Sequence, residues 1–421
     1  MRPQPAEVHM KYFVESYGCT MNYGEGAQLA ERMSGMGYEE SPSAEEADIV
    51  ILNTCTVVDT TEKKMVRRMT DLRSMGKEVI VTGCMAEVQP GRITVRLPDS
   101  LIISPQNYSE FSDKVVTKYG CWHPLDHKDT GISAIVPIAQ GCLGTCSYCI
   151  TRFARGRLIS YPAEELVAEF RKRIENGAKE ILITAQDTAC YGRDTGSSLP
   201  ELLKTMLETP GDYRIRIGMM NPDWLIPIAD DLLDVFKDPR VYRFLHIPVQ
   251  SGSNRILEDM KRMYTVEEFF ALVDLIRARC PDMSISTDMI AGFPGETDED
   301  HRMSVDLLKK LKADTVNITR FSPRPGTKAA NMKRINGRII KERSTELTDV
   351  RIDVETENNK KMIGKNLRVL VTEEGLPGTV IARTDNYRPV GITENIPLGT
   401  FLDVEITDCS STYLIGRTLN N

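Results

Sequence analysis

A regular alternation of short apolar runs and longer amphipathic segments occupies the middle of the chain. Strands separated by helices pair in parallel, because the intervening helix returns the chain to the same end of the sheet. Six consecutive units of this kind predict an α/β fold with a parallel (βα)6 partial barrel. The six apolar runs cover residues 134–139, 180–184, 214–218, 243–247, 284–290 and 315–319.

Three cysteines follow the first of these runs. Cys142, Cys146 and Cys149 have the spacing Cx3Cx2C. Three thiolates so close together can bind three irons of a four-iron, four-sulfur (4Fe-4S) cluster and leave the fourth iron open for chemistry. A zinc knuckle or a reduced cysteine cluster is the alternative, although zinc usually takes four ligands and no second CxxC pair is present. The spacing therefore favours an iron–sulfur cluster.

The loops after the predicted barrel strands carry polar residues and glycines. The carboxyl ends of the strands share one face of such a barrel, and ligands bind at that face. Glycine lets the backbone approach a ligand closely, and Gln, Ser and Asp can bond ribose or amino-acid groups. Each loop alone is equally compatible with a plain turn, but their shared position indicates a binding role. The candidates are Gln186, Asp187, Gln250, Ser251 and Gly292.

The N-terminal part repeats the strand–helix pattern and ends each of three strands near a cysteine. The apolar runs cover residues 11–15, 48–53 and 78–82, and the cysteines that follow are Cys19, Cys55 and Cys84. The alternation predicts a doubly wound parallel sheet, whose strand ends meet at one edge. A buried cysteine at a strand end is individually ordinary. Three in succession indicate a second three-thiolate cluster.

The pattern changes beyond Gly364 to short alternating strands. Runs at 366–372, 378–383, 400–407 and 413–418 predict a small all-β barrel at the C-terminal end. OB-like barrels often bind single-stranded nucleic acid, although this segment is not markedly basic. The preceding charged helical stretch, 335–362, is compatible with a solvated face or with a surface that lies along a phosphate backbone.

Composition excludes few functions. The net charge of −7 does not by itself indicate nucleic-acid binding, although a local basic face could still provide it. No run approaches the roughly 18 apolar residues that span a membrane, and the first ten residues lack a signal core, so a cytoplasmic location is expected. The segment 119–132 has the composition of a linker, in which His123 and His127 should face solvent. The cysteines without partner spacing are expected to be incidental: Cys121, Cys190, Cys280 and Cys409.

The order of these features resembles the methylthiotransferases of the radical S-adenosylmethionine (SAM) superfamily. The resemblance is carried by residues 16–22 (SYGCTMN), 53–55 (NTC), 82–84 (TGC) and the Cys142 loop, and the C-terminal barrel resembles a TRAM domain. It implies an N-terminal methylthiotransferase domain at 10–118, a radical SAM barrel at 128–357 and a TRAM-like RNA-binding domain at 358–421. Residues 154–157 and 160–162 are most similar to the archaeal and eukaryotic branch, which modifies threonylcarbamoyladenosine beside the tRNA anticodon.

The resemblance also implies two 4Fe-4S clusters and SAM as cofactors. The cluster on Cys142, Cys146 and Cys149 would reduce SAM to a 5′-deoxyadenosyl radical, and the other would hold the sulfur. The implied partners are tRNA, an electron donor such as a ferredoxin or flavodoxin, and a sulfur source. Tyr148 could stack on the SAM adenine or pack within its loop. Finally, Arg155 and Arg157 could bind the threonylcarbamoyl carboxylate, or form salt bridges within the barrel.

Other activities share the same motifs. Sister enzymes methylthiolate an aspartate of a ribosomal protein or isopentenyladenosine in tRNA, and they would use the same clusters. A non-enzymatic alternative is an iron–sulfur RNA-binding or electron-carrier protein. That alternative predicts no cleavage of SAM.

Overall fold

The structure is a computed structural model that describes residues 10–121 and 131–419. His123 and His127, in the predicted linker, lie outside these residues. The described chain forms two compact units. The first contains residues before 122 together with 140–142 and 149–157, and the second contains 131–139, 143–148 and the residues from 158 onward. In the described part of the chain, no helix is both long enough and apolar enough to cross a membrane.

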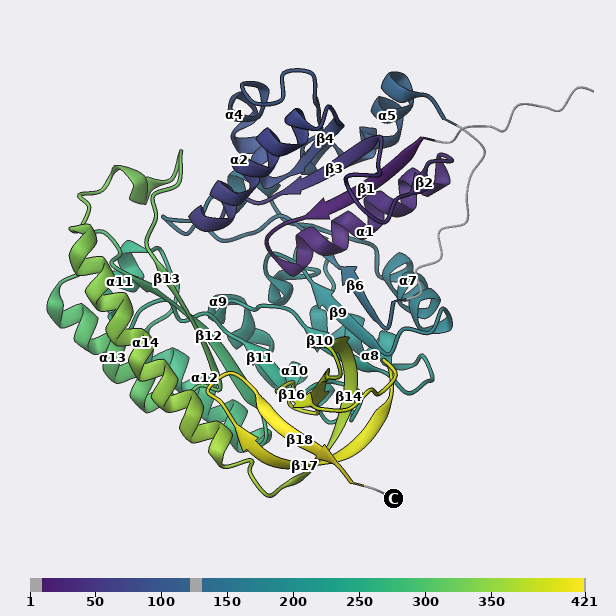
Figure 1. The fold of residues 1–421 in the computed structure, drawn as a ribbon. Helices are drawn as coiled ribbons and strands as arrows, with labels where there is room; N and C mark the ends of the chain where they lie inside the picture. Colours follow the sequence, from purple (N-terminus) through teal and green to yellow (C-terminus); the bar gives the residue numbers. More distant parts are fainter. Residues whose placement is uncertain (1–9, 122–130, 420–421) are drawn as a thin grey trace, which may run out of the picture. The chain divides into compact units, whose positions relative to one another are not determined.

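The first unit is built on a five-stranded parallel sheet with the order β2-β1-β3-β4-β5 (Figure 1). Its central strand β3 (Ile49–Thr54) is buried along its whole length. Ile49 and Ile51 belong to a core on one face of the sheet, whereas Val50 and Leu52 belong to a separate core on the other face. The sheet is therefore covered on both sides, as the doubly wound prediction requires.

Helices contribute to both of these cores. Leu29 of α1 (Thr20–Gly35) packs in one, and Met69 of α2 (Asp59–Ser74) packs in the other. The remaining elements of this unit are β1 (Lys11–Ser16), β2 (Glu39–Glu40), β4 (Glu78–Gly83), β5 (Leu101–Ile102), α3 (Cys84–Val88), α4 (Pro90–Thr94), η1 (Pro105–Glu110), α5 (Phe111–Tyr119) and α6 (Thr151–Arg155).

The second unit contains the six predicted parallel strands. They form two ladders, β6-β9-β10 and β11-β12-β13, and a parallel bridge between Ile215 and Val241 connects β10 to the segment before β11. The order along the sheet follows the order in sequence, which confirms the (βα)6 pattern. The strands are β6 (Ser133–Pro137), β9 (Glu180–Thr184), β10 (Arg214–Ile217), β11 (Phe244–His246), β12 (Ser284–Ala291) and β13 (Thr315–Arg320).

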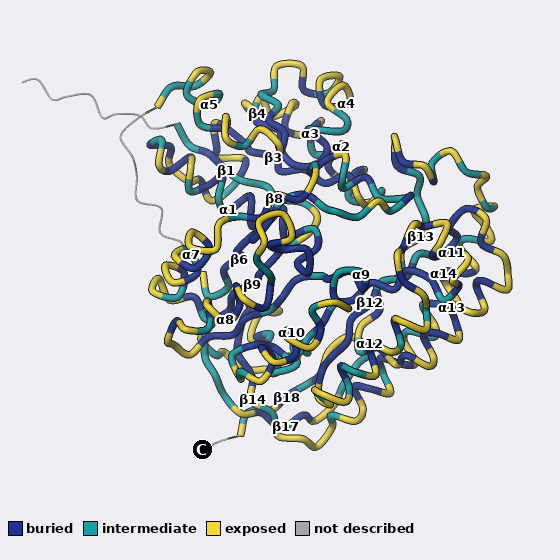
Figure 2. The backbone as a smooth tube through the Cα atoms, turned by 180° about the vertical axis from the view of Figure 1, so that it is seen from behind, coloured by how far each residue is buried: buried dark blue, intermediate teal, exposed yellow. Residues whose placement is uncertain are grey.

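Amphipathic helices cover the outside of these strands, and Figure 2 shows buried and exposed residues alternating along α12 and α13. The amphipathic stretch 223–236, between the third and fourth parallel strands, is not one continuous helix. It divides into α9 (Pro222–Leu225), η3 (Ile226–Ile228) and α10 (Ala229–Val235), because Pro227 cannot continue a helical hydrogen-bond ladder. The other elements are β7 (Ala139–Gln140), β8 (Ile159–Ser160), α7 (Ala163–Glu175), η2 (Thr188–Cys190), α8 (Leu199–Leu207), α11 (Asn254–Asp259), α12 (Val266–Arg279), α13 (Asp298–Leu311), η4 (Lys328–Asn331) and α14 (Gly337–Lys360).

The C-terminal strands close into a small barrel with the order β14-β15-β16-β18-β17. The sequence predicted four strands and missed β16 (Pro389–Ile392), which is four residues long and starts with a proline. It pairs antiparallel with β15 and parallel with β18, and so closes the barrel. The other strands are β14 (Asn366–Glu374), β15 (Val380–Thr384), β17 (Phe401–Cys409) and β18 (Leu414–Thr418).

The small barrel packs against the amino ends of the parallel strands. The Tyr387 ring lies 4.9 Å from the Tyr242 ring and 5.1 Å from the Phe244 ring, between centroids. The Arg243 N–H donates to the carbonyl of Asp385 at 2.8 Å. Because Phe244 is the first residue of β11, this packing leaves ligand binding to the opposite, carboxyl end of the strands.

Candidate functional site

Cys19, Cys55 and Cys84 come together at the carboxyl edge of the first unit's sheet. They follow the neighbouring strands β1, β3 and β4. A Cβ atom added to Gly18 would lie 2.6 Å from the Cβ and 2.8 Å from the Sγ of Cys55. Cys19 is exposed, whereas the other two thiols are buried. The three cysteines thus follow adjacent strand ends of this sheet, and their role as ligands of one cluster stays a prediction.

Glycines without a Cβ atom allow this close approach. Gly18 has a φ of +110°, and Gly83, before Cys84, has a φ of +80° and would place a Cβ 2.2 Å from the carbonyl oxygen of Thr54. Side chains rarely adopt such backbone angles. Glycine therefore precedes Cys19 and Cys84 because a larger residue at either position would clash with neighbouring atoms.

Substitution of Gly18 by alanine is expected to destabilise the first unit by about 1–3 kcal/mol from backbone strain alone, and to displace Cys55. Urea unfolding of the metal-free protein, followed by circular dichroism, measures the change. Gly35→Ala is the matched control, because a Cβ at Gly35 meets no atom within 4 Å. Equal unfolding midpoints for Gly18→Ala and wild type would contradict the steric argument.

A buried arginine contacts this cysteine trio. Arg155 is 1% exposed, and its Nε donates to the Sγ of Cys84 at 3.2 Å. Its Nη2 donates to Asn22 Oδ1 at 2.7 Å, and its Nη1 forms an ion pair with Glu25, which is itself buried. Every nitrogen of the guanidinium thus has a partner. This geometry does not support Arg155 as a ligand of a substrate carboxylate. Arg155 does form a salt bridge, but with Glu25 of the first unit and not within the barrel.

The charge of Arg155 affects the chemistry of Cys84. Burial raises the pKa of the Cys84 thiol to about 12, and the neighbouring guanidinium acts in the opposite direction. A sulfur at this position therefore needs a positive partner, either Arg155 or a metal, to be a thiolate.

The nearby Asn22 holds together the chain segments after β1 and β3, because its Nδ2 donates to the carbonyls of Tyr17 at 2.7 Å and Thr54 at 2.9 Å.

The second cysteine trio belongs to one continuous loop that contributes to both units. Cys142 and Cys149 belong to the first unit, and Cys146 belongs to the second. The Cys142 N–H donates to the carbonyl of Gly156 at 3.3 Å. The Sγ of Cys149 accepts the N–H of Thr151 at 3.4 Å. Backbone hydrogen bonds therefore hold both ends of the loop.

Cys146 has its own buried arginine. Arg262 is 7% exposed, and its Nη1 donates to the Sγ of Cys146 at 3.4 Å. Its Nη2 donates to the carbonyl of Pro248 at 3.1 Å, and its Nε contacts the hydroxyl of Tyr264 at 3.1 Å. One cysteine in each trio thus accepts a hydrogen bond from a buried guanidinium.

The donor sets of the two trios fit iron–sulfur clusters. Each trio supplies three thiols, and hydrogen bonds to ligand sulfurs are a known means of tuning such clusters. Within the described ranges, no group of three or more His, Cys, Asp or Glu side chains is close enough to hold a single metal ion.

Asp187, predicted to bind cofactor, is buried beneath the loops that follow β9 and β10. Its Oδ2 accepts the Nδ2 of Asn221 at 2.6 Å, and its Oδ1 accepts the N–H of Ala189 at 3.2 Å. Burial raises the pKa of this carboxyl. Asp187 therefore joins two neighbouring loops at the carboxyl end of the barrel. Gln186 precedes it in the same loop.

Gln250 and Ser251 lie after β11, also at the carboxyl end. Gln250 has a φ of 71°; its N–H donates to the carbonyl of Asp288, and its carbonyl accepts from Ile290. The Oγ of Ser251 lies 3.5 Å from that of Ser304. These contacts order the loop, and the cofactor roles of both residues stay predictions.

Gly292 and Tyr148 have mainly apolar surroundings. A Cβ at Gly292 would lie 2.5 Å from a side-chain carbon of Ile340, and the Gly292 N–H donates to Glu296 at 3.0 Å. The Tyr148 ring packs edge-on against Phe293, with 6.4 Å between centroids. The Tyr148 ring therefore packs within the protein, as the alternative to a cofactor role requires. Stacking of Tyr148 on a cofactor stays a prediction.

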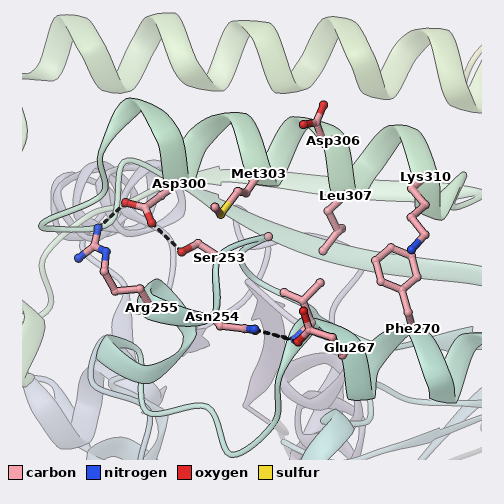
Figure 3. A pocket seen from close by; sticks show the side chains of 12 residues that line it. Ser253, Asn254, Arg255, Glu267, Phe270, Asp300, Met303, Asp306, Leu307 and Lys310 are labelled. Carbon is pink, nitrogen blue, oxygen red and sulfur yellow. Dashed lines mark hydrogen bonds and ion pairs between the residues drawn. The ribbon is translucent and has the colours of Figure 1, made fainter.

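A cavity of about 570 Å³ lies between α11, α12 and α13 (Figure 3). In it, Asp300 accepts hydrogen bonds from Ser253 and Arg255, and Asn254 donates to Glu267. These bonds anchor the loop after β11 to the outer helices. None of the six cysteines lines this cavity.

Three protein-family models match successive parts of the chain. Residues 136–308 match the Radical SAM superfamily, residues 11–104 match Uncharacterized protein family UPF0004, and residues 360–419 match the TRAM domain.

Curated relatives extend over almost the whole chain. A probable threonylcarbamoyladenosine tRNA methylthiotransferase from Pyrococcus horikoshii is 41% identical over 425 residues, which are 97% of this chain and 100% of the relative. The protein of the same description from Archaeoglobus fulgidus is 43% identical, covering 97% of this chain and 98% of the relative. The threonylcarbamoyladenosine tRNA methylthiotransferase of Homo sapiens is 32% identical, covering 98% of this chain and 74% of the relative.

Solved structures share the fold at low sequence identity. The radical S-adenosylmethionine methyltransferase TsrM from Kitasatospora setae, solved with cobalamin and a 4Fe-4S cluster, has a TM-score of 0.57 and 14% identity, covering 76% of this chain and 77% of that chain. This likeness concerns the fold alone.

Proposed function

The chain belongs to the radical SAM methylthiotransferases, and we propose that it adds a methylthio group to C2 of threonylcarbamoyladenosine beside the anticodon of tRNA. The observation that supports this most directly is the pair of cysteine trios, each with a buried guanidinium on one sulfur. The alternatives that act on a ribosomal-protein aspartate or on isopentenyladenosine share the trios, but the relatives named above are described as acting on threonylcarbamoyladenosine.

The six cysteines are the proposed ligands of two 4Fe-4S clusters. Cys142, Cys146 and Cys149 would hold the cluster that binds SAM, and Cys19, Cys55 and Cys84 would hold a second one. When bound, the clusters and SAM supply the radical, the sulfur and the methyl group.

The chain's own residues position these groups. Arg155 and Arg262 place a positive charge and a hydrogen-bond donor on one sulfur of each trio. Burial of both guanidiniums strengthens these hydrogen bonds. Asp187 and Gln250 order the loops at the carboxyl end of the barrel, where Gln186, Ser251, Gly292 and Tyr148 complete the proposed SAM site.

The remaining proposals concern organisation and partners. We assign the methylthiotransferase, radical SAM and TRAM-like domains to residues 10–118, 128–357 and 358–421, consistent with the three family matches. The TRAM domain would contribute to tRNA binding. A ferredoxin or flavodoxin would supply electrons, and a separate sulfur source would restore the transferred atom. A tRNA substrate supports a cytoplasmic location, which is part of the proposal.

The test is mass spectrometry of tRNA nucleosides after anaerobic reaction. Reconstituted protein, SAM and a reductant are incubated with tRNA that carries threonylcarbamoyladenosine. The 2-methylthio derivative is expected, together with 5′-deoxyadenosine from SAM. Cleavage of SAM without this nucleoside would refute the substrate assignment, and intact SAM would favour the non-enzymatic alternative.

A further inference from the structure

An exposed arginine is stacked on a tryptophan at the carboxyl end of the barrel. The guanidinium carbon of Arg193 lies 4.5 Å from the centre of the Trp224 ring. Arg193 belongs to the loop after β9, and Trp224 belongs to α9, which follows β10. Strands β9 and β10 are parallel neighbours, so both residues lie at the ligand-binding end.

This stack is connected to the cysteine loop. The Oδ1 of Asp223, the residue before Trp224, accepts the N–H of Met263 at 3.2 Å. The residue before Met263 is Arg262, whose guanidinium donates to the Sγ of Cys146. Trp224 is thus connected to Cys146 through its chain neighbour Asp223, a hydrogen bond to Met263, and the hydrogen bond from Arg262 to the sulfur. The Arg193–Trp224 pair therefore lies on the side of the barrel mouth that holds this cysteine.

The loop that carries Arg193 is tightly built. The carbonyl of Gly192 accepts the N–H groups of Thr195, Gly196 and Ser197 at 2.7–3.0 Å. The N–H of Gly192 donates to the Oγ of Ser160 at 2.9 Å. The Arg193 side chain therefore extends from a fixed backbone and is held by an aromatic ring, which reduces the entropy lost when it binds a ligand.

The adjacent acidic residue does not neutralise this guanidinium. Asp194 directs its Oδ2 to the N–H of Ser160 at 2.8 Å. Among the described residues, Arg193 has a ring contact with Trp224 and neither an ion pair nor a hydrogen bond from its side chain. In contrast, Arg262 and Arg320 at the same end of the barrel are bonded to Cys146 and Ser344.

We propose that Arg193, held by Trp224, binds the carboxylate of the threonylcarbamoyl group and so selects this nucleoside. The inference rests on the proposed function, which requires a substrate whose modified base carries a free carboxylate. A planar guanidinium can donate two parallel hydrogen bonds to that group, and the contact with the Trp224 ring uses none of its N–H donors. Arg157, the other arginine considered from sequence, has no comparable support in the described residues.

The test compares two anticodon stem-loop RNAs that differ only in the carboxylate. One carries threonylcarbamoyladenosine, and in the other the threonine carboxylate is replaced by its carboxamide. Binding to the reconstituted protein is measured by fluorescence anisotropy without SAM or reductant. Wild-type protein is expected to prefer the carboxylate by about 10- to 100-fold, the range for a hydrogen-bonded charge.

Arg193→Gln is expected to bind both RNAs with the affinity that the wild type has for the carboxamide RNA. The ratio of the two affinities then falls to about 1. Arg193→Lys should retain part of the preference, because it keeps the charge and loses the fork. Trp224→Leu should weaken binding of the carboxylate RNA by about two- to fivefold, as expected for loss of the cation–π contact. Arg171→Gln, which changes an exposed arginine on helix α7, is the matched control and should behave as wild type.

A wild-type preference that persists in Arg193→Gln overturns the inference. Absence of any preference in the wild type also overturns it, even where methylthiolated product forms in the separate turnover assay. A preference that Arg193→Gln abolishes, without product in that assay, supports the carboxylate site and refutes the proposed reaction. The two hypotheses thus fail in different measurements.

Discussion

Replacing Cys84 by alanine is expected to remove all detectable methylthiolated nucleoside while SAM is still cleaved to 5′-deoxyadenosine. The physical reason is that Cys84 belongs to the trio of the first unit, with Cys19 and Cys55, whereas SAM cleavage is assigned to the cysteines of the Cys142 loop. A trio that loses one thiol can bind only two irons of a cluster. Liquid chromatography with mass spectrometry measures both products in one reaction.

Cys146→Ala is the converse variant and is expected to abolish both products. Cys280→Ala is the matched control, because this cysteine lies at the end of α12 outside both trios, and it should retain both activities. Methylthiolated nucleoside formed by Cys84→Ala would remove the sulfur-transfer role from the first trio. Loss of SAM cleavage in that variant would show instead that the two trios do not act separately.

Replacing Arg155 by methionine is expected to lower the free energy of unfolding by about 3–5 kcal/mol, the range for a broken buried ion pair. The variant leaves the carboxylate of Glu25 buried without its partner, and Glu25 is only 3% exposed. One oxygen of this carboxylate already has no hydrogen-bond partner. Urea unfolding of the metal-free protein, followed by circular dichroism, measures the loss without any contribution from bound iron.

Two further variants separate the ion pair from general effects of substitution. Arg152→Gln changes an arginine on the same helix that is not fully buried, and it should alter the stability by no more than about 0.5 kcal/mol. Adding Glu25→Gln to Arg155→Met removes the buried charge and should recover part of the loss. Unchanged unfolding of Arg155→Met would show that the pair contributes no net stability.

Local sequence pattern determined most of the fold. The strand–helix alternation predicted all six barrel strands, because each of them carries buried apolar residues. It missed β16, which is only four residues long and begins with a proline. The six cysteines were also identified from sequence, since their spacing and their strand-end positions are local features.

The tertiary structure alone decided which side chains serve these cysteines. Arg155 and Cys84 are 71 residues apart, and Arg262 and Cys146 are 116 residues apart. The sequence alone allows Arg155 to be a substrate ligand, because sequence does not reveal burial of a particular charge. The stack of Arg193 on Trp224 likewise joins two loops that meet only because β9 and β10 are neighbours. Contacts of this kind depend on how strands pair in space, and no periodicity along the chain encodes them.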